Sequence, residues 1–151
     1  MENPRVPADI DLVETELLLL ARWLEANQRR QRYPMDRAAY LLLRRLDADG
    51  PQRVAELATA LGLDGSTVTR QLTTLEGAGH VRRSAHPTDA RATLVTATSA
   101  GRRAMDALRR HRQERIALLL DGWSPRERSE LARVVGHLNE ALRAHVARSD
   151  T

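Results

Sequence analysis

One segment, Ser66–Arg83, places short hydroxyl side chains and an arginine on one side of a predicted helix. At about 100° per residue, Val68, Leu72 and Leu75 fall together and predict the face that packs into the core. The outward residues are Ser66, Thr69, Arg70, Thr73 and Thr74. Hydroxyls can donate to phosphates or base edges, threonine methyls can meet thymine methyls, and arginine can hold guanine O6 and N7 bidentately. The alternative is a solvated helix face that happens to be rich in threonine.

A short helix and a tight turn precede this segment. Arg53–Leu61 is predicted to be helical, with Gly62 just past its end and Asp64 as the N-cap of the next helix. Its side chains Leu57 and Leu61 are expected to pack inward. This order of elements predicts a helix-turn-helix, whose second helix enters the major groove of DNA.

The sequence changes from helical to strand periodicity after Gly79. Val81–Ser84 and Ala92–Thr96 are predicted strands joined by a turn, so they form a β-hairpin that we call the wing. Arg91, at the wing tip, can enter a narrow minor groove, where the potential is most negative. The alternative is a solvated loop arginine paired with Asp89. The two can coexist, because the aspartate can brace the guanidinium.

Helices with apolar stripes are predicted at both ends of the chain. The six predicted helices cover about residues 9–30, 38–46, 53–61, 65–77, 99–121 and 125–146. Ser124–Glu127 is a capping box that starts the last of them. The stripes Ile10–Leu24 and Leu131–Leu142 are expected to pack together and against a second copy around a two-fold axis. Residues 1–34 and 99–151 are therefore predicted to form a helical dimerisation region, and residues 35–98 a winged helix-turn-helix DNA-binding region, in a mainly α chain.

The composition excludes several function classes. The chain has 151 residues, no cysteine and a net charge of +4. Disulfides, thiolate metal sites and thiol redox switches are excluded, and the basic excess favours a polyanionic partner. Walker loops, nucleophile elbows, paired carboxylates and HxxxH spacings do not occur, so we predict no enzyme, no metal and no cofactor. No membrane span or signal peptide is recognisable, and a cytoplasmic location is expected.

These motifs together resemble the MarR family of winged helix-turn-helix regulators. The resemblance lies in "AELATALG", "STVTRQLTTLEGAGHVRR", "HPTDARATLVTATSAG" and "WSPRERSELARVV", and it covers about residues 10–146. Two positions depart from the family pattern. Ala90 stands where the family often has a second arginine, and Ala97 stands where it usually has leucine. The first departure predicts weaker contacts from the wing.

The resemblance implies a homodimer that binds a palindromic operator in double-stranded DNA and usually represses. It also implies that a small molecule, often aromatic or phenolic, binds between the dimerisation and DNA-binding parts. The predicted DNA-binding residues are Ser66, Thr67, Thr69, Arg70, Thr73, Thr74, Arg82 and Arg91, with Asp89 as wing support. Trp23 and Tyr40 either line an effector pocket or fill contacts between helices. The alternative function is a winged-helix module that binds proteins without specific DNA binding.

Overall fold

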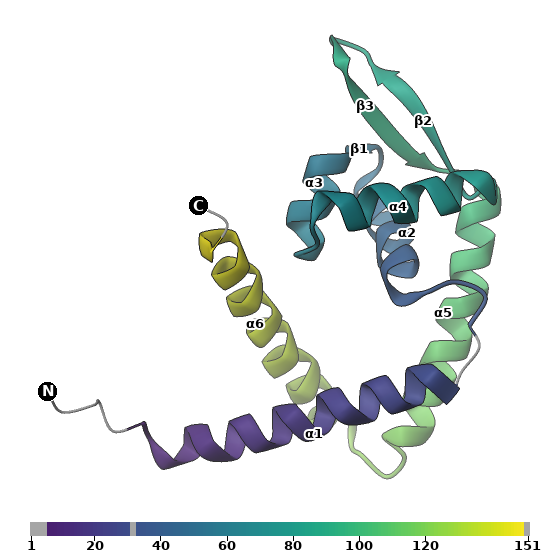
Figure 1. Cartoon of the computed structure of the whole chain (residues 1–151). Coiled ribbons are helices and arrows are strands. Elements are labelled where there is room, and N and C mark those ends of the chain that lie inside the picture. Colours follow the sequence, from purple (N-terminus) through teal and green to yellow (C-terminus); the bar gives the residue numbers. More distant parts are fainter. Residues whose placement is uncertain (1–5, 31–32, 150–151) are drawn as a thin grey trace, which may run out of the picture. The chain divides into compact units, whose positions relative to one another are not determined.

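The computed structural model describes residues 6–30 and 33–149, with every side chain there except those of Gln28, Ala90, Arg91 and Ser149. Within these residues the chain forms six helices and three short strands in the order α1, α2, β1, α3, α4, β2, β3, α5, α6 (Figure 1). It separates into two compact units, Met1–Pro34 and Met35–Thr151. The predicted fold class, mainly helical with a winged helix-turn-helix, is confirmed.

The first unit contains one helix, α1 (Ala8–Arg30). Asp9 and Asp11 lie in its first turn and Arg29 and Arg30 in its last, so the charges at both ends complement the helix dipole. None of its described side chains is buried. Across all the residues that the structure describes, no helix is long and apolar enough to cross a membrane.

The second unit has a core shared by α2 (Arg37–Asp49), α3 (Val54–Leu61), α4 (Gly65–Gly77), the strands and the first half of α5 (Ser99–Leu119). The largest fully buried side chains are Leu42, Leu43, Leu46, Leu57, Val68, Leu72, Val95 and Met105. Burying one such side chain fully is worth about 1.5–3 kcal/mol. The core therefore holds α4 firmly against α2 and α3.

Three antiparallel strands form the sheet, in the order β1 (Gln52–Arg53), β3 (Asp89–Ala97) and β2 (Val81–His86). β2 and β3 are the predicted hairpin, and both extend further toward the tip than the sequence indicates. β1 is not predicted, because two residues before a helix cannot show a strand pattern. Pairing of β1 with β3 ties the start of α3 to the base of the wing.

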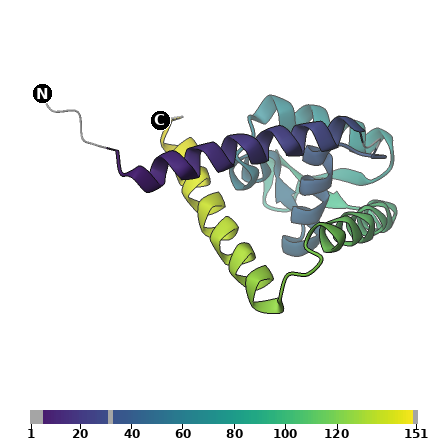
Figure 2. The ribbon, with the colours of Figure 1, turned by 90° about the horizontal axis from the view of Figure 1, so that it is seen from below.

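The start of α5 is fastened to the loop after α4. Thr98 caps α5 by accepting a hydrogen bond from Gly101 N at 3.0 Å, and its hydroxyl donates to Gly79 O at 2.7 Å. Thr98 N also donates to His80 O at 2.9 Å. From this junction α5 runs alongside α2 (Figures 1 and 2).

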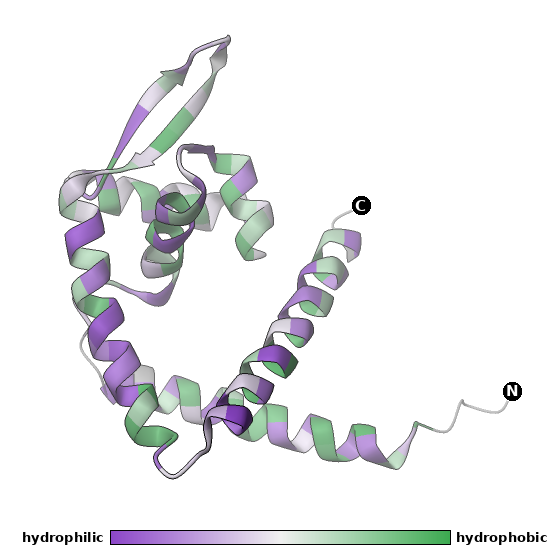
Figure 3. Cartoon of the chain, turned by 180° about the vertical axis from the view of Figure 1, so that it is seen from behind, coloured by the Kyte–Doolittle hydropathy of each residue, from purple (hydrophilic) through white to green (hydrophobic). Residues whose placement is uncertain are grey.

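The last helix, α6 (Pro125–Ser149), begins at the predicted capping box. Ser124 N donates to Glu127 Oε2 at 2.7 Å, and Glu127 N donates to Ser124 Oγ at 3.2 Å. Apolar residues recur along this helix (Figure 3). None of its described side chains is buried.

Candidate nucleic-acid interface

Helix α4 divides into a buried face and an exposed face, as its sequence predicts. Val68 and Leu72 are fully buried and Leu75 is 2% exposed. The exposed residues include Ser66, Thr69, Arg70, Thr73 and Thr74, whereas Thr67 is half-buried. Because the core fixes one face, the opposite face is presented to solvent in a defined orientation.

Asp64 binds the hydroxyls at the start of α4. Its Oδ1 atom accepts from Thr67 N at 2.7 Å, which is the predicted N-cap, and from Ser66 Oγ at 2.5 Å. Its Oδ2 atom accepts from Thr67 Oγ1 at 2.6 Å. The hydrogen bonds from Ser66 and Thr67 favour the ionised carboxylate and hold the pKa of Asp64 well below its usual value.

Two further threonine hydroxyls donate to the helix backbone. Thr73 Oγ1 donates to Thr69 O at 2.9 Å, and Thr74 Oγ1 donates to Arg70 O at 3.2 Å. This bonding to the carbonyl four residues earlier is a common arrangement for threonine within helices. The sequence interpretation treats these hydroxyls as donors toward DNA, but the structure shows their protons used within the helix.

Arg70 is the long cationic side chain of this exposed face. Among the residues that the structure describes, its guanidinium has no hydrogen-bond or ion-pair partner. Glu76 is the one acidic residue within α4, and it lies at the far end of the helix from Asp64. A guanidinium without a partner, on a face of otherwise short side chains, is suited to donate two hydrogen bonds to the edge of a base.

The two adjacent arginines of β2 differ. Arg82 is exposed, as a phosphate contact requires. Arg83 Nε lies 3.3 Å from Glu76 Oε2, and Arg83 Nη2 donates to Thr73 Oγ1 at 3.4 Å. Arg83 therefore joins the first strand of the wing to the end of α4.

At the other side of the wing, an arginine from β1 approaches the hairpin turn. Arg53 Nη2 lies 3.8 Å from Asp89 Oδ2 and 3.4 Å from His86 Nε2. Asp89, the first residue of β3, therefore contacts an arginine of β1, in addition to the wing-support role that the sequence predicts for it. Arg91 lies in β3, and its side chain falls outside what the structure describes. Nothing in the sequence indicates the part played by Arg53, because it lies 33 residues from His86 along the chain.

A further contact joins α4 to α2. Gln71 Nε2 donates to Asp36 Oδ2 at 2.6 Å, while Asp36 Oδ1 accepts from Ala39 N at 2.8 Å and caps α2. One carboxylate thus fixes the start of α2 and the flank of α4. The sequence interpretation overlooks both Gln71 and Asp36. The polar side chain of Gln71 on the flank of α4 is the sequence feature that could have indicated the contact.

The two candidates for an effector pocket lie in different surroundings. Tyr40 is buried in α2, with the guanidinium carbon of Arg112 4.9 Å from its ring centroid. Arg44 Nη1 donates to Tyr40 Oη at 3.4 Å. Tyr40 is therefore part of the core between α2 and α5. Trp23, in the first unit, is 66% exposed.

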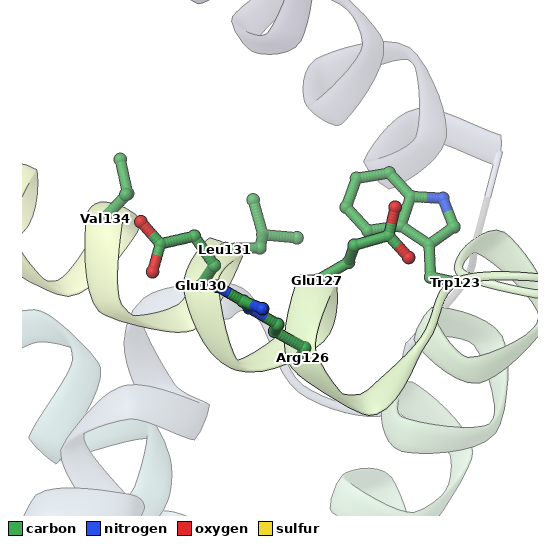
Figure 4. Close-up of a pocket in the computed structure, with 6 residues that line it drawn as sticks. All are labelled: Trp123, Arg126, Glu127, Glu130, Leu131 and Val134. Atoms are coloured by element: carbon green, nitrogen blue, oxygen red, sulfur yellow. The ribbon is translucent and has the colours of Figure 1, made fainter.

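A shallow apolar groove lies along the start of α6. Trp123, Leu131 and Val134 project from one side of this segment, and three charged side chains border them (Figure 4). The charged residues are Arg126, Glu127 and Glu130. Trp123 is 42% exposed and Leu131 39% exposed, so this apolar side is open in a single chain.

Comparisons with known proteins agree with this geometry. The MarR family model matches residues 35–93, which span α2 to the wing. A curated relative from Bacillus subtilis (strain 168), the HTH-type transcriptional regulator YxaD, is 36% identical over 136 residues, covering 88% of this chain and 94% of the relative.

Two solved structures show the same fold at low identity. A MarR protein from Peptoclostridium difficile DA00132 has a TM-score of 0.76 and 16% identity, covering 99% of this chain and 97% of its own. BpsR of Bordetella bronchiseptica, whose DNA binding is regulated by 6-hydroxynicotinic acid, has a TM-score of 0.66 and 21% identity, covering 83% and 98%.

Proposed function

Because the chain belongs to the MarR family of transcriptional regulators, we propose that it binds a palindromic operator in double-stranded DNA as a homodimer and represses transcription until a small molecule releases it. The observation that carries the proposal is the exposed face of α4. Arg70 stands there among short side chains, while the opposite face is locked into the core. A helix held in this way can approach the floor of the major groove.

The contacts at the end of α4 next to the wing support a groove-reading role. Glu76, the one acidic residue within α4, is paired with Arg83. Arg82 is exposed and is proposed to contact a phosphate, and Arg91, which lies in β3, is proposed to contact the flanking minor groove. The proposed DNA contacts are the residues that the sequence predicts: Ser66, Thr67, Thr69, Arg70, Thr73, Thr74, Arg82 and Arg91.

A second copy of the chain would cover the open apolar stripes. Leu142 is 52% exposed, Val135 40% and Ile10 48%, although such side chains are usually buried. A two-fold dimer covers the same stripe on both copies at once. It would also place two α4 helices about one DNA turn apart, roughly 34 Å, on an inverted repeat.

Release by an effector would act on the distance between the two α4 helices of the dimer. A small aromatic molecule could favour a spacing of the two α4 helices that does not match DNA. Such coupling is typically about 1–3 kcal/mol, or roughly 5–150-fold in affinity. Of the two side chains that the sequence suggests for such a contact, Tyr40 is taken up by the core of the second unit, whereas Trp23 is 66% exposed. Trp23 is therefore the proposed contact. BpsR, whose DNA binding responds to 6-hydroxynicotinic acid, is a relative in fold alone.

The test is selection of bound sequences from a random duplex pool, followed by titration of the selected operator and a scrambled duplex. We expect an inverted repeat and a preference that survives excess non-specific DNA. Arg70→Ala should cost about 1–3 kcal/mol on the operator and much less on the scrambled duplex. Arg91→Ala should weaken both duplexes more evenly and flatten the salt dependence.

The alternative, a winged-helix module that binds proteins, predicts another result. Operator and scrambled duplexes would then bind equally and weakly, and Arg70→Ala would change neither selectively. That outcome would refute operator reading by α4.

A further inference from the structure

The hydrogen-bond polarity of Ser66 can be assigned from its contacts. A serine hydroxyl has one proton to donate and two lone pairs that accept. The proton of Ser66 is used by Asp64 Oδ1, at 2.5 Å from Ser66 Oγ. Ser66 lies in the first turn of α4 and on the same exposed side as Arg70. It can therefore offer only lone pairs to a molecule that approaches this face.

The contact with Asp64 is hard to break. Hydrogen bonds to an ionised carboxylate are roughly twice as strong as those between neutral groups. Asp64 is ionised at neutral pH, and the hydrogen bonds from Ser66 and Thr67 lower its pKa further below the usual value. Turning the Ser66 proton toward a neutral base edge would exchange a charge-assisted bond for a weaker one.

The middle of α4 supplies an independent observation of the same kind. The protons of Thr73 and Thr74 go to the carbonyls of Thr69 and Arg70. Arg83 also donates to Thr73, which uses one of its lone pairs. On this face Arg70 is thus a strong hydrogen-bond donor. The hydroxyl protons of Ser66, Thr73 and Thr74 are already engaged in hydrogen bonds within the protein.

Building on the function proposed above, we propose that Ser66 is a specificity-determining residue that accepts a hydrogen bond from adenine or cytosine in the major groove, with Asp64 as its positioning residue. In that groove only adenine N6 and cytosine N4 donate, whereas guanine and thymine present acceptors alone. In each half-site, the base that contacts Ser66 is therefore expected to be adenine or cytosine. It lies on the DNA strand that the first turn of α4 faces. Reversing that base pair sets an acceptor against the Ser66 lone pairs.

The experiment compares three variants with the wild-type protein on duplexes that carry each of the four base pairs at every half-site position. The half-site position at which Ser66→Ala abolishes the base preference is the position that Ser66 contacts. At that position we expect wild type to prefer adenine or cytosine by roughly 2- to 10-fold, the value of one hydrogen bond.

Two substitutions of Asp64 form a matched pair. Asp64→Ser keeps an N-capping oxygen but lacks an acceptor long enough for Ser66, so the preference should be lost. Asp64→Asn keeps an Oδ1 atom that accepts from Ser66 but loses the charge that strengthens this bond, so the preference should persist in weaker form. Denaturation midpoints show whether each variant is folded. If Asp64→Ser does not fold, the comparison of Ser66→Ala with wild type alone tests whether Ser66 accepts from adenine or cytosine.

Three results overturn the inference. They are a preference for guanine or thymine at the position that Ser66→Ala identifies, a preference that Asp64→Ser leaves intact, and a Ser66→Ala variant that keeps every preference of the wild type. Failure of the proposed function looks different, because wild type would then bind operator and scrambled duplexes equally.

Discussion

Gly101, in the first turn of α5, packs directly on the backbone of His80, which follows α4. A Cβ atom at Gly101 would stand 2.1 Å from His80 O and 2.9 Å from the His80 carbonyl carbon. Thr98 N and its hydroxyl bond to the same loop, at His80 O and Gly79 O. The start of α5 and the loop after α4 therefore meet without room for a side chain. A movement of one of them must displace the other.

Gly101→Ala should destabilise the fold, because the methyl group would meet backbone atoms that cannot rotate away. We expect a loss of about 1–3 kcal/mol in the free energy of unfolding, measured by urea denaturation. Gly77→Ala is the matched control, since nothing lies within 4 Å of a Cβ there. An equal effect of the two substitutions would contradict the close packing of Gly101 on His80.

Local features of α4 and its neighbours could be predicted from sequence. The N-cap Asp64 and its bond to Thr67 span three residues, and the buried face of Val68 and Leu72 follows from helical periodicity. The capping box at Ser124 is equally local. Such features depend on side chains within one helical turn, so their spacing alone specifies them.

The contacts that brace the candidate interface could not be predicted in this way. Gln71 and Asp36 are 35 residues apart in sequence, and their contact exists only once α2 and α4 have packed. Strand β1 likewise depends on pairing with β3 rather than on any pattern of its own. The sequence alone also does not decide where the hydroxyl protons of Thr73 and Thr74 go, because an exposed threonine can donate outward or, as here, to its own helix.

Leu142→Glu should convert the proposed dimer to monomers without unfolding the chain. Leu142 is 52% exposed in a single chain, so a glutamate there remains solvated in the monomer. In a dimer it would become a buried, unpaired charge, which costs about 3–5 kcal/mol. Sedimentation at micromolar concentration should show a dimer for wild type and a monomer for the variant, with unchanged helical content by circular dichroism.

Ala144→Glu is the control for that substitution. Ala144 is also exposed and lies about 200° further round α6, away from the apolar stripe. This variant should remain dimeric. A folded wild-type monomer, or a dimer that tolerates glutamate at Leu142, would show that the α6 stripe is not the interface.

The Asp64 contacts predict a dependence of stability on pH. The pKa of Asp64 in the folded chain is lower than its usual value of 3.8, so its contribution to stability is present above that value. It is lost as the pH falls below 3.8 toward the depressed native pKa. The difference in urea midpoint between wild type and Asp64→Ala should therefore be larger at pH 7 than at pH 3. A difference that stays constant would show that the ionised carboxylate is not what stabilises the start of α4.

Arg83 is expected to aid DNA binding by neutralising Glu76, rather than by contacting a phosphate. Removing it leaves an uncompensated carboxylate at the end of α4, which would repel the phosphates of DNA bound to this helix as proposed above. Arg83→Gln should therefore weaken operator binding by about 0.5–1.5 kcal/mol, roughly 2- to 10-fold, and the loss should shrink at high salt. Glu76→Gln in the same chain should restore most of the affinity, because it removes the charge that Arg83 had paired.

Titration of the single and double variants at two salt concentrations separates the two roles of Arg83. Arg45→Gln is the matched control, since Arg45 pairs with Asp49 at 2.6 Å at the end of α2, outside the recognition helix. It should leave operator affinity unchanged. If Arg83→Gln lowers operator affinity equally in the wild-type chain and in the Glu76→Gln chain, Arg83 acts on the DNA directly. The ion pair at 3.3 Å would then be a resting contact that DNA displaces.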